Sequence, residues 1–424
     1  MDRLEKNKHI ADTMRETYAK RKSQICKCFK FKIDKSNLSK QQANQLKMQF
    51  VEAKWIYNYL LSQDDIFHFD YKKLDIITHK DKHGNDITVQ LSYISSALKQ
   101  GLIKQIINQI KGLSILKKKG HQVGKLKYKS EFNCIELKQY NNTHSIRGNK
   151  IKIQGIKSPV RVNGLKQLNK YENIDYANAK LTYDGNDYYV ILTCYIDKEI
   201  IHKQYKNDIV GIDMGVSTNL TLSDGTKYNI SIEESEKLKR LQAKLAKQQK
   251  GSNNRYKTIK KIRKEYTHIN NKKNDISNKI VSSILSNNKI VVIQDEQIGK
   301  WKQDGLSGNK IQHSILGRIK SKLSINERVV ILDKWFPTTK YCSHCGSKIE
   351  LDLKDRIFEC PNCKEKEDRD IHASKNMIWF YLQYNKLDRS GTDHTSIKGP
   401  VKIAYNKFVS KLAKQEDTTS LALC

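Results

Sequence analysis

The sequence predicts a multidomain protein of mixed α/β and β class, and three observations support this. In the first 200 or so residues, short alternating segments are broken by two amphipathic stretches, which predicts a β module interrupted by helices. From residue 207, apolar strand-like runs alternate with helical runs, as in α/β domains. Near the end, two Cys-x-x-Cys pairs enclose fourteen residues, which is the spacing of a structural zinc site.

The charge of the chain is strongly one-sided. Its 424 residues include 79 Lys and Arg against 45 Asp and Glu, a formal net charge of +34. Such a charge repels itself without a polyanion, so we expect nucleic acid as the partner. The alternatives are a lysine-rich protein with solvated faces, or one that binds anionic membrane. No run approaches the roughly 18 apolar residues of a membrane helix.

The cellular location follows from the start of the chain and from its cysteines. The first ten residues, MDRLEKNKHI, carry charges where a signal peptide needs an apolar segment. Of nine cysteines, four fall in the Cys-x-x-Cys pairs and the rest are scattered. We therefore expect a cytoplasmic, nucleoid-associated prokaryotic protein with reduced thiols. Cys26 and Cys28 form a Cys-x-Cys that could bind metal, although ordinary strand residues are the favoured interpretation.

The first elements are a strand and a helix. Residues 27–33 alternate Phe and Ile with Lys, the period of a half-buried strand. Ser39 and Gln42 form a capping box, and apolar residues then recur at helical spacing up to Leu60. A polar turn at 83–86 leads to a second amphipathic helix from about Leu98 to Leu113.

Short strands follow from about residue 130. They include residues 151–156 and 159–162, and then a hairpin over 180–196 that turns at Asp-Gly-Asn. With the strand at 27–33, these segments predict one β module.

The second half alternates strands with helices. Residues 207–225 predict two strands, and residues 232–286 predict a basic helical hairpin that bends at 251–255. The remaining elements are a strand at 288–297, a helix at 311–323, a strand at 328–335 and a helix at 371–382, followed by a polar, aperiodic tail.

Three acidic positions stand where the pattern indicates a strand or its end. They are Asp213, the Gln-Asp-Glu cluster at 294–296, and Asp370. Buried carboxylates are costly unless a cation compensates them. Two magnesium ions about 4 Å apart, or manganese in their place, are one such solution, and they support phosphodiester hydrolysis. Alternatively, Asp213 is a turn residue and Asp370 a helix cap.

The zinc ligands follow from the cysteine spacing. Each pair places two thiolates on one side of a tight turn, so Cys342, Cys345, Cys360 and Cys363 should hold one structural zinc ion. His344 is then an additional histidine and not a ligand.

Four segments together carry a family resemblance: GIDMGVSTNLTLSDG, VVIQDEQIGKW, KWFPTTKYCSHCG and FECPNCKEKEDRDIHASKN. In this order they resemble the RuvC motifs and zinc ribbon of the TnpB family of transposon-encoded RNA-guided DNA nucleases. The miniature type V CRISPR effectors are similar too. The resemblance is strong over residues 207–382, and it is weaker in the N-terminal half.

The resemblance implies an RNase H-like (RuvC) core whose catalytic, magnesium-binding acids are Asp213, Glu296 and Asp370. Where most relatives have an acid-Asp-Leu triplet, this chain has Gln294, Asp295 and Glu296, so Asp295 stays an alternative to Glu296. Side chains alternate along a strand, which places Gln294 and Glu296 on one face. His372 stands where relatives usually have Asn.

Several basic and aromatic residues could contact nucleic acid. Arg369 could hold the scissile phosphate, with a surface arginine as the alternative. We expect the helical hairpin to line a DNA channel through Lys260, Lys261, Arg263 and Lys264. Trp301, Trp335 and Tyr341 could stack on bases, but packing is the favoured role for each.

The domains expected from these patterns run in order along the chain. They are a β segment of a wedge-like, barrel-like module (1–38), a helical recognition domain (39–130), the β-rich remainder of the wedge-like module (131–206), a RuvC-like core (207–340) with the hairpin as an insertion, a zinc ribbon (341–366), the last core motif and helix (367–385), and a flexible tail (386–424).

The expected function is RNA-guided DNA cleavage. The partners would be a guide RNA and a duplex DNA with a short adjacent motif, and a monomer is expected rather than a homodimer. The alternatives are an RNA-guided repressor that has lost cleavage, and a guide-independent transposition-associated DNA-binding protein. The sequence leaves open the guide, the motif, and whether the context is a transposon or CRISPR.

Overall fold

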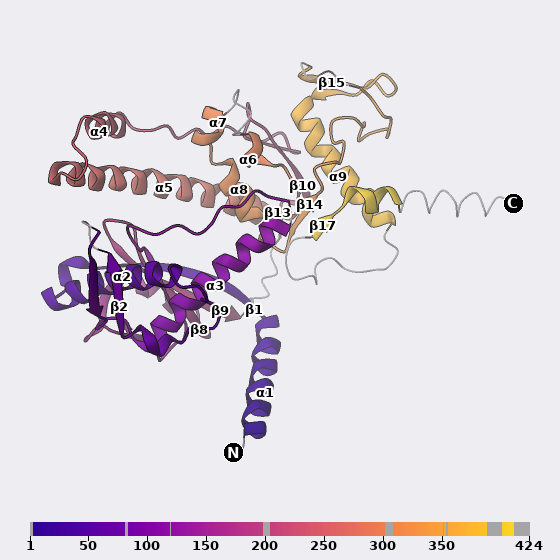
Figure 1. Ribbon diagram of the computed structural model, residues 1–424. Helices are drawn as coiled ribbons and strands as arrows, with labels where there is room; N and C mark the ends of the chain where they lie inside the picture. The colour runs from indigo at the N-terminus through magenta and orange to yellow at the C-terminus, as the bar shows by residue number, and fades with distance from the viewer. Residues whose placement is uncertain are drawn as a thin grey trace. The chain divides into compact units, whose positions relative to one another are not determined.

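The computed structural model describes residues 3–80, 84–118, 120–197, 204–301, 308–350, 352, 355–387 and 401–410. The chain divides into two compact units, Met1–Ile201 and His202–Cys424 (Figure 1). None of the helices in these ranges combines the length and the apolar character that a membrane crossing requires.

The first unit is built on a seven-stranded sheet in the order β4-β8-β9-β1-β7-β6-β5. Tyr140, which follows edge strand β4, forms an isolated bridge with His144 of the other edge strand, β5, and the sheet forms a near-closed β-barrel. The expected barrel-like module is therefore present. Its strands are β1 (Gln24–Ile33), β4 (Cys134–Leu137), β5 (His144–Arg147), β6 (Lys150–Ile153), β7 (Val160–Asn163), β8 (Ile174–Tyr183) and β9 (Tyr188–Asp197).

Two long helices pack with the barrel in one apolar core. They are α2 (Lys40–Leu61), which begins with the predicted capping box of Ser39 and Gln42, and α3 (Ser96–Lys118). Glu52 of α2 is buried, and its carboxylate accepts the backbone N–H groups of residues 92–94 at 2.9 Å each. These bonds fix the start of α3. Short 3₁₀ helices cover Lys35–Asn37, Tyr71–Leu74 and Leu165–Lys170.

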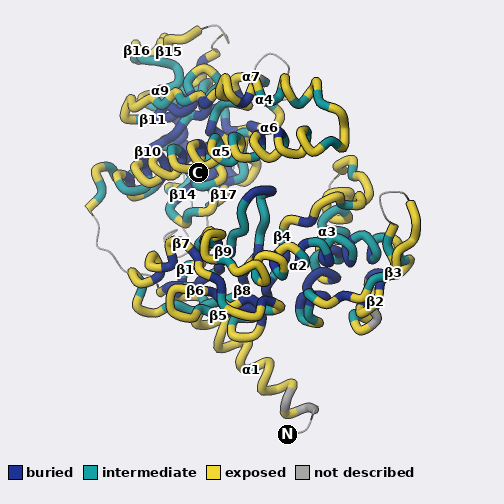
Figure 2. Tube along the Cα trace, turned by 90° about the vertical axis from the view of Figure 1, so that its left-hand side faces the viewer, coloured by how far each residue is buried: buried dark blue, intermediate teal, exposed yellow. Residues whose placement is uncertain are grey.

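Two elements of the first unit were not predicted. Helix α1 (Arg3–Lys22) is exposed over most of its described side chains, in yellow in Figure 2. It has no continuous apolar stripe that sequence periodicity could detect. The predicted polar turn near residue 84 lies at the tip of a hairpin formed by β2 (Ile76–Lys80) and β3 (Asp86–Gln90), while residues 81–83 lie outside the described residues.

The second unit contains a six-stranded mixed sheet in the order β12-β11-β10-β13-β14-β17. Strands β10, β13, β14 and β17 run parallel, β11 is antiparallel to β10, and β12 is antiparallel to β11. Their bounds are β10 (Asn207–Met214), β11 (Leu220–Leu222), β12 (Lys227–Tyr228), β13 (Asn288–Gln294), β14 (Val329–Leu332) and β17 (Val401–Ile403).

Helices cover both faces of this sheet. The predicted basic hairpin consists of α4 (Glu236–Ala246) and α5 (Asn253–Asn287), and α5 packs with α8 (Leu316–Leu323) on one face. The other face packs against α9 (Arg369–Leu387). Short helices α6 (Ile298–Trp301) and α7 (Gly308–His313) precede α8.

Gly211 sets the distance between α9 and the sheet. A β-carbon at this position would lie 1.9 Å from the carbonyl oxygen of Ser374, so only a glycine permits the observed backbone contact between β10 and α9.

The segment expected to be a tail contributes a strand. Residues 401–403 pair in parallel with β14, and residues 405–410 are helical, which corrects the expectation of a flexible tail there. Three strand residues are too few to give a periodic signal. The rest of the expected tail, residues 388–400 and 411–424, lies outside the described residues.

Candidate functional site

The four predicted zinc ligands come together between β14 and α9, next to the small sheet of β15 (Ile357–Glu359) and β16 (Lys366–Asp368). All four sulfur atoms lie within 4.8 Å of one another. Two of the distances, Cys342–Cys363 and Cys345–Cys360, are 3.6 Å. Tetrahedral coordination with Zn–S bonds of about 2.3 Å requires sulfur atoms about 3.8 Å apart. The cluster therefore has the geometry of a zinc site.

Hydrogen bonding at the cluster favours the thiolate form of one cysteine, which is the form that binds zinc. The Ser347 hydroxyl lies 3.2 Å from the Cys345 sulfur and lowers the pKa of that thiol to about 6. Gly346, with φ of 75°, allows the tight turn between them.

Asp213 lies near the carboxyl end of β10 and is half-buried. Its pKa is raised to about 7, first by burial and then by the negative charges of Asp370 and Glu296. Arg369 lowers this pKa slightly, by its positive charge. Asp213 thus experiences the charge of both other predicted acids.

Helix α9 places Asp370 toward Asp213. Ser374, one turn after Asp370, contacts Gly211, and Gly211 precedes Asp213 by two residues on the same face of β10. Asp370 is the second residue of α9 and is not its cap. The cap is Asp368, whose carboxylate accepts the backbone N–H groups of residues 370 and 371 at 3.0 and 3.2 Å.

The Gln294-Asp295-Glu296 cluster divides between the two faces of the sheet. Gln294 is buried and donates to the backbone oxygen of Phe336 at 2.8 Å. Asp295 is exposed and pairs with Lys320 of α8 at 2.7 Å, on the opposite face. Glu296 is half-buried, with a pKa that burial raises and Lys320 lowers. It is Glu296, and not Asp295, whose charge contributes to the raised pKa of Asp213.

The three carboxylates are electrostatic neighbours, but they do not form a closed ligand set. Among the described residues, the four cysteines are the group whose ligand atoms all approach within 4.8 Å, and the acids are not part of such a group. Oxygen donors of this kind are the ligands that magnesium takes. Their mutual repulsion, visible at Asp213, is what a bound divalent cation would relieve.

Arg369 contacts the ribbon segment. Its guanidinium donates to the backbone oxygens of Asp352 and Asp355, at 3.0 and 3.2 Å. Arg369 is therefore bonded within the chain, and its contact with the scissile phosphate stays a prediction.

His372 is fully buried and connects α9 to the ribbon. One ring nitrogen lies 2.9 Å from a Glu367 carboxylate oxygen and the other 2.7 Å from the backbone oxygen of Tyr341. The ring also stacks on Phe358. The histidine thus anchors the helix that carries Asp370.

Some of the residues predicted to contact nucleic acid are exposed, and others are partly buried or packed in the core. Lys260, Lys261 and Lys264 are exposed on α5, whereas Arg263 is half-buried. Trp301 and Tyr341 pack against apolar clusters, as favoured. Trp335 is 65% exposed, with the Lys334 ammonium 4.3 Å from its ring centroid, so packing does not explain it.

Sequence reasoning missed the cations that surround the acids. Lys320 and Lys334 both lower the pKa of Glu296, and Lys227 pairs with Asp368 at 2.7 Å. These lysines come from separate elements, so no spacing along the chain could have indicated them.

Comparison with known proteins gives two adjacent family matches. Residues 193–303 match OrfB_IS605, described as a probable transposase, and residues 313–377 match the Cas12f1-like TNB domain. A Streptomyces pristinaespiralis protein, named as a candidate RNA-guided DNA endonuclease, is 29% identical over 178 residues, which cover 40% of this chain and 44% of that protein. InsQ of Escherichia coli K12, named likewise, is 26% identical over 197 residues, covering 40% and 48%.

Two solved structures show weaker likeness. A Cas12f1–sgRNA–target DNA complex aligns with 84% of this chain and 99% of its own, at 14% identity and a TM-score of 0.42. The structure of the mini-RNA-guided endonuclease CRISPR-Cas_phi3 aligns with 90% of this chain over 94% of its own length, at 10% identity and a TM-score of 0.37. Both scores lie below 0.5, so these likenesses do not define the fold.

The aligned region spans about half the length of the curated relatives. The two family matches, over residues 193–303 and 313–377, include Asp213, Glu296, Asp370 and the four-cysteine cluster. Over this region, the chain is similar to the TnpB (OrfB_IS605) family.

Proposed function

We propose that this protein is an RNA-guided DNA endonuclease with an RNase H-like (RuvC) core. Asp213, Glu296 and Asp370 would be its catalytic acids. The observation that carries the proposal is the raised pKa of Asp213, to which Asp370 and Glu296 both contribute from other elements. Like charges that converge at the carboxyl ends of parallel strands are typical of a functional site.

The metals of this proposal fit the donors in the chain. Asp213, Glu296 and Asp370 would hold magnesium, or manganese, and the four cysteines would hold one structural zinc ion. When bound, two divalent ions activate water and stabilise the leaving oxygen of a phosphodiester. The chain's part is to orient the three carboxylates: Gly211 brings α9 close, His372 anchors it, and Lys320 holds the segment of Glu296.

The partners are proposed from the relatives and the charge. One curated relative is named for RNA-guided DNA cleavage, and one similar solved structure contains a guide RNA and target DNA. A net charge of +34 suits a protein that holds an RNA–DNA duplex by its phosphates while base pairing selects the target.

Co-purification and cleavage together test the proposal. The chain is expressed with its flanking DNA, the bound RNA is sequenced, and a plasmid with a randomised flank is offered in Mg²⁺. We expect a discrete RNA and cleavage next to a short motif, which Asp213→Ala abolishes. The matched control is Asp224→Ala, an exposed acid in the same unit.

Three outcomes separate the alternatives. Cleavage by the Asp213→Ala protein would exclude the proposed acid site. RNA-directed binding without cleavage by the native protein would indicate a repressor. Absence of a discrete RNA would indicate a guide-independent protein.

A further inference from the structure

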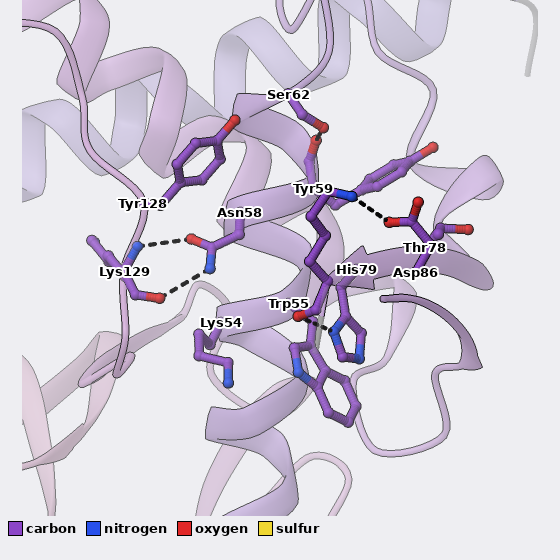
Figure 3. Close-up of a pocket in the computed structure, with 11 residues that line it drawn as sticks. Lys54, Trp55, Asn58, Tyr59, Ser62, Thr78, His79, Asp86, Tyr128 and Lys129 are labelled. Atoms are coloured by element: carbon purple, nitrogen blue, oxygen red, sulfur yellow. Dashed lines mark hydrogen bonds and ion pairs between the residues drawn. The ribbon is translucent and has the colours of Figure 1, made fainter. Parts of the chain in front are cut away.

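A pocket of about 630 Å³ lies in the first unit, between α2 and the β2–β3 hairpin. Its walls come from α2, the hairpin and the segment around Tyr128 (Figure 3). None of the acids or cysteines of the candidate site lines this pocket. Its volume is in the range of pockets that hold small organic groups.

Aromatic rings dominate the walls of the pocket. The rings of Trp55 and His79 stack 4.7 Å apart at an angle of 13°, and Tyr59 and Tyr128 add two more rings. Figure 3 shows Tyr128 on one side, Trp55 and His79 on the other, and Asn58 between them. Tyr128 is 66% exposed and makes no contact with another ring or hydrogen-bonding group among the described residues, so packing does not explain its position.

The rim of the pocket is basic. Lys54 and Lys80 line it, and one carboxylate, Asp86, pairs with Lys80 at 3.2 Å, whereas the Lys129 ammonium lies 4.0 Å from the centroid of the buried Tyr57 ring. Lys125 and Lys127 are exposed next to Tyr128 along the chain. Positive groups beside flat aromatic faces are the combination that binds single-stranded nucleic acid, through phosphates and stacked bases respectively.

The pocket is held in shape by bonds that do not use its aromatic faces. The Asn58 side chain donates to the Lys129 backbone oxygen at 2.9 Å and accepts from the Lys129 N–H at 2.8 Å. The hairpin is tied by a 3.1 Å bond between the hydroxyls of Thr78 and Thr88. The backbone on both sides of the pocket is therefore held in place before a ligand binds.

We propose that this pocket binds an unpaired nucleobase of a single-stranded segment of RNA or DNA. A paired base offers a protein only its edge in a groove, whereas a concave pocket lined by rings accepts the whole face of a base outside the helix. The inference rests on the proposed function for the presence of nucleic acid. It does not depend on cleavage.

Crosslinking with a reactive base tests the pocket directly. The full-length Asp213→Ala protein is irradiated with short strands that carry a single 5-iodouracil, as RNA, as DNA, and as the blunt duplex of the DNA. Mass spectrometry then locates the modified residues. We expect adducts on Trp55, His79, Tyr59 or Tyr128 with a single strand and not with the duplex. Comparison of the adduct yields from RNA and from DNA shows which of the two the pocket prefers.

Variants give the second readout. Tyr128→Leu removes an exposed ring, and Tyr18→Leu on α1, at 71% exposure, is the matched control. An unlabelled ordinary strand and an abasic strand of equal charge each compete with the crosslinking strand for the protein. The difference between their affinities measures the contribution of the bases to binding. We expect Tyr128→Leu to reduce that contribution about fivefold or more, and Tyr18→Leu to leave it unchanged.

Three results would overturn the proposal. They are adducts confined to other parts of the chain, equal adduct yields from single strand and duplex, and no loss of base preference in a Tyr128→Leu protein whose melting temperature is unchanged. Because none of these results is a measurement of cleavage, none depends on the nuclease function. Conversely, an inactive native nuclease that still forms the expected adducts would refute the proposed function alone.

Discussion

At the scale of single residues, the orientation of neighbouring side chains separates two adjacent acids. Strand alternation predicts that Gln294 and Glu296 share a face and that Asp295 points away. Asp295 indeed reaches Lys320 on α8, and the charge of Glu296 acts on Asp213. The role of Glu296 in catalysis stays a prediction.

This arrangement predicts different results for two conservative variants. Glu296→Gln removes a proposed metal ligand, so cleavage should fall about a hundredfold or more. Asp295→Asn removes an exposed ion pair and should change cleavage by less than about fivefold. Rates are measured on the same guided target. A larger loss for Asp295→Asn would transfer the proposed role to Asp295.

His144 predicts a pH dependence of stability in the first unit. It is 2% exposed, and burial lowers its pKa to about 4, against a smaller opposite effect of a hydrogen bond with the Ala177 backbone. The unfolded chain, with a histidine pKa near 6.5, therefore binds the proton more readily. Stability should fall as the pH drops from about 6.5 to 4, by up to about 3 kcal/mol.

His144→Gln tests this dependence. The difference in unfolding free energy between the native and variant proteins is measured at several pH values, so that other titrating groups cancel. The variant should lack the loss of stability between pH 6.5 and 4. A parallel pH profile for both proteins would contradict the prediction.

At the scale of elements, the ribbon and α9 act together. Arg369 bonds to two ribbon carbonyls, and His372 bonds to Glu367 and to the backbone of Tyr341. Loss of metal from the cysteines should therefore disorder the start of α9, where Asp370 lies.

Cys342→Ser should accordingly abolish cleavage while the first unit keeps its stability. Bound zinc is measured by elemental analysis, and local unfolding by hydrogen exchange over residues 340–376. Cys28→Ser, an exposed thiol outside the cluster, is the control. Full activity in a zinc-free Cys342→Ser protein would separate the ribbon from the acid site.

The α4–α5 hairpin predicts a contact with DNA. Lys260 and Lys261 are exposed on α5, whereas Lys237 and Lys239 on α4 are already paired with Glu265 and Glu236. Replacing Lys260 and Lys261 by Gln should weaken DNA binding and cleavage several-fold, because exposed lysines with no ion pair among the described residues are available to phosphates. The same change at Lys237 and Lys239 is the charge-matched control, and equal effects would argue against the channel.

The sequence predicted elements with strong periodic signals and missed weak ones. Helix α2, with its capping box, and the basic hairpin follow from apolar stripes and turn residues. Helix α1 has no such stripe, and although β3 alternates polar and apolar residues, β2 and β3 have only five residues each and are mostly exposed, which gives a weak signal. The cysteine cluster was predictable because its spacing is local. The lysines around the acids, which come from distant segments, were not.

At the scale of the whole molecule, the charge predicts how binding responds to salt. A net charge of +34 should release many counterions from nucleic acid, so the logarithm of the affinity should fall linearly with the logarithm of salt concentration. Titrations with the same RNA at several salt concentrations give the slope. A slope near zero would show that contacts other than phosphates dominate.

Each unit carries its own candidate site. The first unit contains the aromatic pocket, and the second contains the acids and the cysteine cluster. Ligand binding and chemistry can therefore be tested by separate substitutions, since no residue belongs to both sites.

The contact between Gly211 and Ser374 has a consequence for mutational tolerance. In a saturation library selected for activity, position 211 should reject every substitution, alanine included, because any side chain separates α9 from β10. Such a profile is indistinguishable from that of a catalytic acid, although glycine has no reactive group. Intolerance at this position would result from the short distance between the backbones of β10 and α9. A ranking of positions by fitness alone would wrongly identify Gly211 as a catalytic residue.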